Sequence, residues 1–221
     1  MLKNRLIPVI LLRDGVVVQS KRFQRYQPLG NPTMIVQRLS DWASDELIYL
    51  DISRARSYDL GRDDLCDGNA AELFAILRDI ARRCFMPLTF GGGIRTLQEV
   101  ADRIQGGADK VVINTQAFAA PAFIADCAHE FGSQCVVVCI DARRTDDGGW
   151  EVFTSGGRTA TGRRPADWAR EAEGRGAGEI LIQSIDRDGT GAGYDLALVR
   201  CVAEAVWIPV IALGGVGRWQ H

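Results

Sequence analysis

The sequence predicts an α/β protein built from repeated strand–helix units, on the basis of three observations. Short apolar runs rich in β-branched residues alternate with longer stretches of helical periodicity. These runs are almost continuously hydrophobic, which is typical of parallel strands covered on both faces. The two halves of the chain also resemble each other, since residues 90–95 (FGGGIR) match residues 213–218 (LGGVGR). Together these features favour a parallel (β/α) barrel.

The expected elements follow from these runs. Strands are expected at residues 6–11, 47–50, 87–90, 110–113, 135–140, 179–183 and 209–213, and helices at residues 33–43, 70–84, 97–106, 121–131, 165–174 and 196–205. Hairpin turns are expected at residues 13–16 and 145–150. Because eight strands close such a barrel, seven imply an open barrel or a truncated chain, and truncation is favoured. We therefore expect one domain over residues 1–221 that lacks the eighth unit.

Composition excludes several classes of function. The chain has 221 residues and a net charge of -2, which gives no reason to expect nucleic acid or an anionic membrane as a partner. No apolar run reaches the roughly 18 residues of a membrane span, and the apolar N-terminal stretch reads as a first strand rather than a leader. A cytoplasmic location is therefore expected.

Cysteine usage gives little sign of a metal or cofactor. None of the six cysteines forms a CxxC pair. Cys135 and Cys139 would share one face of a strand near His129, so a metal site is conceivable. Buried free thiols are the favoured interpretation, and neither a metal nor a cofactor is expected.

Small polar residues and glycines follow several strands, at the end where barrel enzymes place their functional groups. They are found at residues 91–93 and 114–115 in the first half, and at residues 188–190 and 214–215 in the second. Glycine allows close backbone approach, and exposed amides there can hold phosphate. The pattern predicts two phosphate-sized cradles on opposite sides of one barrel mouth, although a single Gly-Gly could be a tight turn.

Carboxylates at strand ends form a second signal. Asp51, Asp141 and Asp186 each follow an apolar run, and Asp188 lies close behind. An aspartate there is expected to face the barrel mouth or to be paired, because burying it alone is costly. Asp141 is the preferred candidate for a general acid/base. The alternative is a salt bridge with Arg143 or a loop cap.

Charged residues lie at or near the opposite ends of four strands. They are Arg5, Glu46, Lys110 and Glu179. They could form a charged ring closing the bottom of the barrel, or simply a stabilising network of ion pairs. The polar stretch 57–69 after the second strand is either a lid or a solvated surface loop.

Eight short motifs, taken together, resemble the cyclase subunit of imidazole glycerol phosphate synthase, over residues 1–221. They are residues 90–94 (FGGGI), 107–110 (GADK), 113–115 (INT), 131–134 (FGSQ), 140–142 (IDA), 176–181 (GAGEIL), 184–190 (SIDRDGT) and 193–195 (GYD). The resemblance implies a (β/α)8 TIM barrel of the ribulose-phosphate-binding type, here apparently truncated after the seventh strand. It also implies a class I glutaminase partner that forms a heterodimer and supplies ammonia through the barrel.

The resemblance assigns roles to the residues already singled out. The ammonia gate would be formed by Arg5, Glu46, Lys110 and Glu179, and Asp109 would lie in the docking surface. One phosphate would be held by Gly93, Asn114 and Thr115, and the other by Gly189, Gly214 and Gly215. Asp141 would be one of two catalytic aspartates.

One departure from the family pattern bears on activity. Leu11 stands where the family has its first catalytic aspartate, and Gln19 or Ser20 replaces an expected lysine. Leucine cannot transfer a proton, so imidazole ring closure is in doubt. A divergent branch of the family passes ammonia to a sugar amidotransferase in surface-polysaccharide synthesis, and Leu11 with an intact gate favours that role. Histidine biosynthesis, or a non-catalytic scaffold for the glutaminase, are the alternatives.

Overall fold

A computed structural model describes residues 5–42, 44–54, 72–218 and 220–221. The described chain forms two compact units: unit 1 contains Met1–Gln19 and Gln27–Val112, and unit 2 contains Ser20–Tyr26 and Ile113–His221. The expected loop at residues 57–69 lies outside the described residues.

Unit 1 is organised around parallel strands. These are β1 (Val9–Arg13), β4 (Leu47–Asp51), β5 (Leu88–Gly91) and the first part of β6 (Lys110–Ile113). Tyr49 pairs in register with Phe90 on the next strand, and their rings stack with centroids 6.1 Å apart. Both side chains are fully buried, which explains why these strands read as continuous apolar runs.

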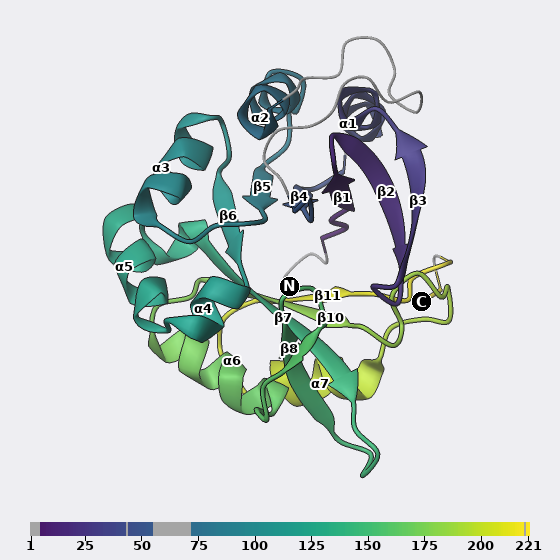
Figure 1. Cartoon of the computed structure of the whole chain (residues 1–221), viewed down its shortest axis with the longest axis vertical. Helices are drawn as coiled ribbons and strands as arrows, with labels where there is room; N and C mark the ends of the chain where they lie inside the picture. The colour runs from purple at the N-terminus through teal and green to yellow at the C-terminus, as the bar shows by residue number, and fades with distance from the viewer. Residues whose placement is uncertain (1–4, 43, 55–71, 219) are drawn as a thin grey trace. The chain divides into compact units, whose positions relative to one another are not determined.

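Three helices follow the strands of unit 1 and lie outside them in Figure 1: α1 (Pro32–Asp41), α2 (Leu73–Ala81) and α3 (Leu97–Gln105). Their starts are encoded locally. Asn31 caps α1 by accepting a hydrogen bond from the Thr33 amide, and Thr96 caps α3 by accepting one from the Glu99 amide. The apolar faces of α1 and α2 pack on the strands in one buried cluster.

The first predicted hairpin is larger than the turn expected from the sequence. Asp14 and Gly15 have positive φ values of 51° and 81°, as a tight two-residue turn requires. The turn joins β1 to β2 (Val16–Lys21), and the chain returns through β3 (Arg25–Gly30). The first strand itself begins at Val9, three residues later than predicted.

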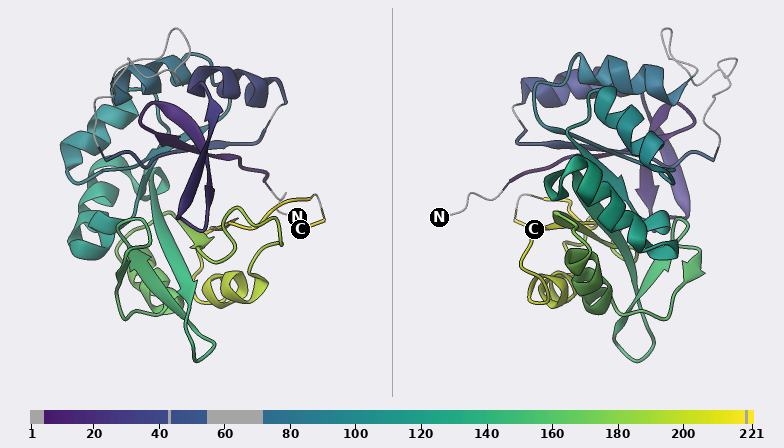
Figure 2. Two further views of the ribbon diagram at one scale, coloured as in Figure 1. Left: turned by 45° about the vertical axis from the view of Figure 1, so that its right-hand side comes forward. Right: turned by 90° about the vertical axis from the view of Figure 1, so that its left-hand side faces the viewer.

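Unit 2 contains parallel strands β7 (Val136–Arg144), β10 (Glu179–Ser184) and β11 (Val210–Leu213). Its helices are α4 (Thr115–Ala119), α5 (Ala122–Phe131), α6 (Pro165–Gly174) and α7 (Leu196–Ala203), and the 3-10 turn η1 spans Ser133–Cys135. Strand β8 (Trp150–Thr154) pairs antiparallel with β7 and carries the short β9 (Thr159–Ala160). In both views of Figure 2 the turn between β7 and β8 projects beyond the rest of unit 2.

The α/β class and the order of parallel strand–helix units are confirmed, as in a partial TIM barrel. Two further local features differ from expectation. Strand β7 continues through Asp141 to Arg144, because it pairs with β8 there. The short helix α4 was not predicted, since five residues are too few for a periodic pattern. Among the helices that the structure describes, none is long and apolar enough to cross a membrane.

Candidate functional site

Asp141 is the most perturbed carboxylate of unit 2. It lies on β7 with 5% of its surface exposed, two residues after Cys139 and at the start of the segment that pairs with β8. The Asn114 side-chain amide donates to Asp141 Oδ2 at 2.9 Å, and the Cys139 thiol lies 3.5 Å from Oδ1. Burial raises the pKa of Asp141 to about 6, although both hydrogen bonds act in the opposite direction. A buried carboxyl with a raised pKa at a strand end is a candidate site for proton transfer.

The alternative partner for Asp141 is engaged elsewhere. The Arg143 guanidinium donates to the Gly157 carbonyl at 3.1 Å and lies over the Phe153 ring at 4.4 Å. Asn114 and Thr115 begin α4 at the end of β6, and Thr115 Oγ1 accepts a hydrogen bond from the Ser155 amide at 3.0 Å. Asn114, expected from sequence to hold phosphate, thus contacts the candidate catalytic carboxylate.

Asp188 organises the tip of the β2–β3 hairpin. Its Oδ2 accepts hydrogen bonds from Ser20 Oγ at 2.6 Å and from the Phe23 amide at 3.2 Å. The Arg22 amide donates to the Asp188 carbonyl at 3.0 Å. Arg22 and Phe23 both have positive φ values, which are unusual for residues with side chains, so this carboxylate holds a backbone that would otherwise be unfavourable.

The three glycines predicted for the second phosphate site follow β10 and β11 and lie tightly against backbone. A Cβ at Gly189 would be 2.1 Å from the Ser20 carbonyl oxygen, and one at Gly215 would be 2.1 Å from the Gly193 carbonyl oxygen. Gly214 is also constrained, since a Cβ there would be 2.9 Å from the Ser184 carbonyl oxygen. All three have positive φ values, so a side chain is excluded by both space and conformation.

The remaining carboxylates at strand ends have local partners. Asp186 accepts a hydrogen bond from the Arg144 amide at 2.8 Å. In unit 1, Asp51 Oδ1 accepts from the Ser53 amide at 3.0 Å and from Ser53 Oγ at 2.5 Å. Burial raises the pKa of Asp51, while its hydrogen bonds to Ser53 lower it. Gly93, the predicted phosphate ligand that lies in unit 1, has φ +62°, and a Cβ built on it would meet nothing within 4 Å.

Three of the four predicted gate residues meet at the start of the unit 1 strands. Glu46, only 7% exposed, accepts hydrogen bonds from Arg5 through Oε1 and from Lys110 Nζ through Oε2 at 3.3 Å. One buried carboxylate thus bridges two cations. Glu179, the fourth, is buried at the start of β10 in unit 2.

Asp109 is exposed at the start of β6. Its Oδ2 accepts a hydrogen bond from the Leu88 amide at 2.7 Å, which ties the starts of β5 and β6 together. Leu11, at the position of the family's first catalytic aspartate, lies on β1 opposite Leu50 of β4 and Val18 of β2. Its neighbours in the sheet are therefore apolar side chains.

The cysteines are free thiols in the described part of the chain, and burial raises the pKa of Cys139 well above its usual range. Cys66 lies outside the described residues. No group of three or more His, Cys, Asp or Glu side chains among the described residues is placed to hold a metal ion.

Comparison with known proteins identifies the family. The histidine biosynthesis protein family matches residues 5–221. The chain belongs to this family. The imidazole glycerol phosphate synthase subunits HisF of Streptococcus gordonii and Streptococcus sanguinis are each 42% identical to it over 221 residues. The match covers the whole of this HisF-family chain and 83% of each relative.

Sequence reasoning did not foresee two contacts of this HisF-family chain. The Asn114–Asp141 hydrogen bond joins the residue that follows β6 to a residue within β7, and the Ser20–Asp188 hydrogen bond joins residues 168 positions apart. The only available signal was that each residue lies at or beside a strand end. That placement groups residues at one edge but does not show which of them pair.

Proposed function

We propose that this chain is a HisF-type synthase subunit of a glutamine amidotransferase, which receives ammonia from a class I glutaminase subunit. The observation that carries the proposal is the bridging of Arg5 and Lys110 by buried Glu46 at the start of the strands. A carboxylate bound to two cations by side chains alone can exchange partners without unfolding a helix or strand. Such a cluster suits a gate better than a purely structural contact.

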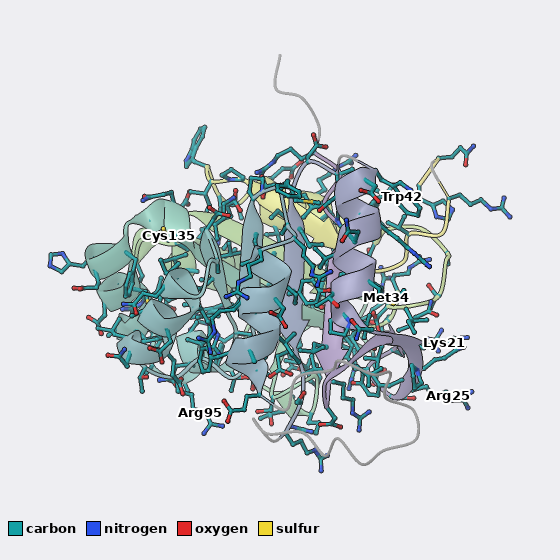
Figure 3. All side chains as sticks on the ribbon, turned by 90° about the horizontal axis from the view of Figure 1, so that it is seen from above. Lys21, Arg25, Met34, Trp42, Arg95 and Cys135 are labelled. Atoms are coloured by element: carbon teal, nitrogen blue, oxygen red, sulfur yellow. The ribbon has the colours of Figure 1, made fainter. Side chains whose placement is uncertain are left out.

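The same end of unit 1 carries exposed apolar residues that support docking of a protein partner. Leu6, Trp42 and Phe85 lie just before β1, β4 and β5 and are 52%, 76% and 89% exposed. Trp42 lies at the opposite end of unit 1 from Arg95, which follows β5 (Figure 3). Exposed aromatic residues in such numbers are typical of interfaces, where they act as anchors.

Binding to a purified class I glutaminase tests this proposal. Trp42→Ser and Phe85→Ser should each weaken the heterodimer by at least about tenfold, as expected when an interface anchor is removed. Met34→Ser is the matched control, since Met34 is also exposed and lies in the first turn of α1. Failure of the unaltered chain to co-elute with the glutaminase, or equal weakening by all three variants, would contradict the proposed docking surface.

Chemistry at Asp141 is the second part of the proposal. Its pKa of about 6 suits a group that both gives and takes a proton near neutral pH. Leu11 offers no second proton-transfer group. We therefore favour delivery of ammonia to a sugar amidotransferase of surface-polysaccharide synthesis, where a sugar rather than the imidazole precursor is the acceptor.

Imidazole glycerol phosphate formation is the second candidate, and the names of both relatives favour it. A role as a non-catalytic scaffold for the glutaminase is the third. An assay with ammonium salts and the bisphosphorylated ribulose aminoimidazole substrate distinguishes the cyclase role from the other two. Robust turnover would support the cyclase and exclude the sugar-amidation role as the main one. Stimulated glutamine hydrolysis without any aminated product would support the scaffold.

A further inference from the structure

Cys139 and Asp141 form a buried pair on β7. They lie two residues apart, so their side chains project from the same face of the strand. The Cys139 thiol donates a hydrogen bond to Asp141 Oδ1 at a sulfur–oxygen distance of 3.5 Å, and each residue is only 5% exposed. Asn114 donates to the other oxygen, Oδ2, at 2.9 Å. The carboxyl group is therefore held through both of its oxygens.

The residue beside Asp141 on the neighbouring parallel strand is directed elsewhere. Gln183 of β10 is in register with Asp141, but its side-chain amide donates to Asp188 Oδ1 at 3.5 Å. Asp188 is itself buried, and its negative charge raises the pKa of Asp141. This strand therefore adds a second negative charge rather than a donor to the surroundings of Asp141.

The other elements packed against β7 turn mainly uncharged side chains toward it. Strand β8 places Phe153 in register with Asp141, and the Arg143 guanidinium lies over that ring at 4.4 Å. The helices α5 and α6 also contact β7, and their buried residues are apolar apart from the Cys127 thiol. In the described part of the chain, Asp188 is the charged residue that acts on the pKa of Asp141.

The thiol of Cys139 keeps its proton while Asp141 ionises. Burial raises the pKa of Cys139 well above its usual range, and the charge of Asp141 and their hydrogen bond raise it further. Asn114 acts on this pKa in the opposite direction, with a smaller effect. Cys139 therefore stays a hydrogen-bond donor at every pH at which Asp141 gains or loses its proton.

A thiol is a weaker donor than a hydroxyl of similar shape. A strong donor to a carboxylate favours the ionised form and lowers its pKa, whereas burial favours the protonated form. With cysteine at position 139, burial has the larger effect, and the pKa of Asp141 is raised to about 6. The type of residue at position 139 is therefore expected to set how readily Asp141 keeps its proton.

We infer that Cys139 is a positioning residue for proton transfer at Asp141, because its thiol orients the carboxyl group through Oδ1 with only a weak hydrogen bond. A stronger donor would hold the carboxyl group as well but would favour its ionised form. The inference deepens the proposed function, since it rests on proton transfer at Asp141. The hydrogen bond and its effect on ionisation can be measured without any assay of activity.

NMR titration of the aspartate side-chain carboxyl carbons in the full chain measures this effect, with Asp141→Asn to assign the signal. Cys139→Ser supplies a stronger donor and should lower the midpoint of the Asp141 titration by about 0.5–1 pH unit, the size expected for one net hydrogen bond. Cys139→Ala removes the donor and should raise the midpoint, so it carries the test if the serine variant fails to fold. Cys201→Ser is the control, because Cys201 is an exposed thiol on α7 of the same unit, and it should leave the midpoint unchanged.

The pH dependence of amination tests the second half of the inference. In the complex with a class I glutaminase, the pH of half-maximal formation of aminated product should move in the same direction as the titration midpoint in each variant. Unchanged midpoints, or midpoints that move the same way in Cys139→Ser and Cys139→Ala, would overturn the inference whatever the function of the chain. Shifted midpoints without a shifted pH profile, or without any aminated product, would instead contradict proton transfer at Asp141, and the role of Cys139 would fail with it.

Discussion

The Asn114 side-chain amide donates a 2.9 Å hydrogen bond to Asp141, a carboxylate that is only 5% exposed. One residue directly follows β6 and the other lies within β7. The hydrogen bond favours the ionised carboxylate, but burial has the larger effect, and the pKa rises to about 6. The ionisation of Asp141 is therefore expected to affect both the free energy of unfolding and the capacity of this residue to transfer a proton.

Replacing Asp141 by asparagine should remove a pH-dependent loss of stability. The folded pKa lies above the usual value of 3.8, so the folded state retains a proton that the unfolded state releases between about pH 4 and pH 6. Stability from this group is thus present below pH 4 and lost as pH rises through 6. At pH 8 the variant should be more stable by about 1–3 kcal/mol, and at pH 4 the difference should vanish.

Urea unfolding at several pH values measures this effect. Asp126→Asn is the control, because Asp126 is exposed on α5 of the same unit. If the free energies of unfolding of Asp141→Asn and of the unaltered chain change in parallel from pH 4 to pH 8, then burial does not raise the pKa of Asp141.

Restoring a carboxylate at Leu11 should raise cyclase activity. Leu11→Asp supplies the proton-transfer group that the family pattern has there, and such groups contribute roughly 10²- to 10⁴-fold to rate. We expect turnover of the ribulose aminoimidazole substrate with ammonium salts to be weak in the unaltered chain and to rise by about 10-fold or more in the variant. Leu11→Asn, which matches the size of aspartate without its proton chemistry, should give no increase; an equal increase would point to polarity rather than catalysis.

Removing the charge of Glu46 should uncouple glutamine hydrolysis from ammonia use. Glu46→Gln loses the negative charge that bridges Arg5 and Lys110, leaving two cations close together at the start of the strands. In the complex with a class I glutaminase, we expect a lower ratio of aminated product to glutamine hydrolysed. Externally supplied ammonium should restore product formation. Asp45→Asn, a change at the adjacent carboxylate, is the comparison, and an equal loss of coupling there would argue against a specific gate.

The hairpin tip should loosen when its link to Asp188 is lost. Ser20→Ala removes the buried 2.6 Å hydrogen bond and leaves one oxygen of Asp188 with fewer donors, at a cost of about 1–3 kcal/mol. Amide hydrogen exchange at Arg22 and Phe23, whose amides donate to Asp188, should accelerate more than exchange elsewhere. Uniform acceleration across unit 2 would indicate a general loss of stability instead.

A side chain at Gly189 should disturb the same hairpin from the other side. Gly189→Ala places a Cβ 2.1 Å from the Ser20 carbonyl oxygen at a φ of +63°, so both the hairpin tip and the residue itself must move. We expect a loss of about 2 kcal/mol or more in the free energy of unfolding. Gly156→Ala is the matched control, since it also has a positive φ but meets nothing within 4 Å. Equal losses in the two variants would mean that backbone strain alone, without the overlap, sets the effect.

The sequence by itself determined the order of the parallel strands and of the longer helices in this protein. Apolar runs such as residues 136–140 and 179–183 specify strands because both faces of a parallel strand are buried. Asn31 and Thr96 mark helix starts because a cap acts on amides only two or three residues away. The sequence also placed Glu46 and Lys110 near strand starts and Asp141 at the end of an apolar run, because the limits of these runs mark where the strands begin and end.

Only the tertiary structure decided which of these residues meet and in what environment. Nothing local pairs Asn114 with Asp141, joins Ser20 to Asp188, or buries Arg103 beneath the Gly92 carbonyl. Hydrogen bonding and desolvation depend on distances of a few ångströms between segments far apart in the chain. The raised pKa of Asp141 therefore exists only once the strands and helices have packed.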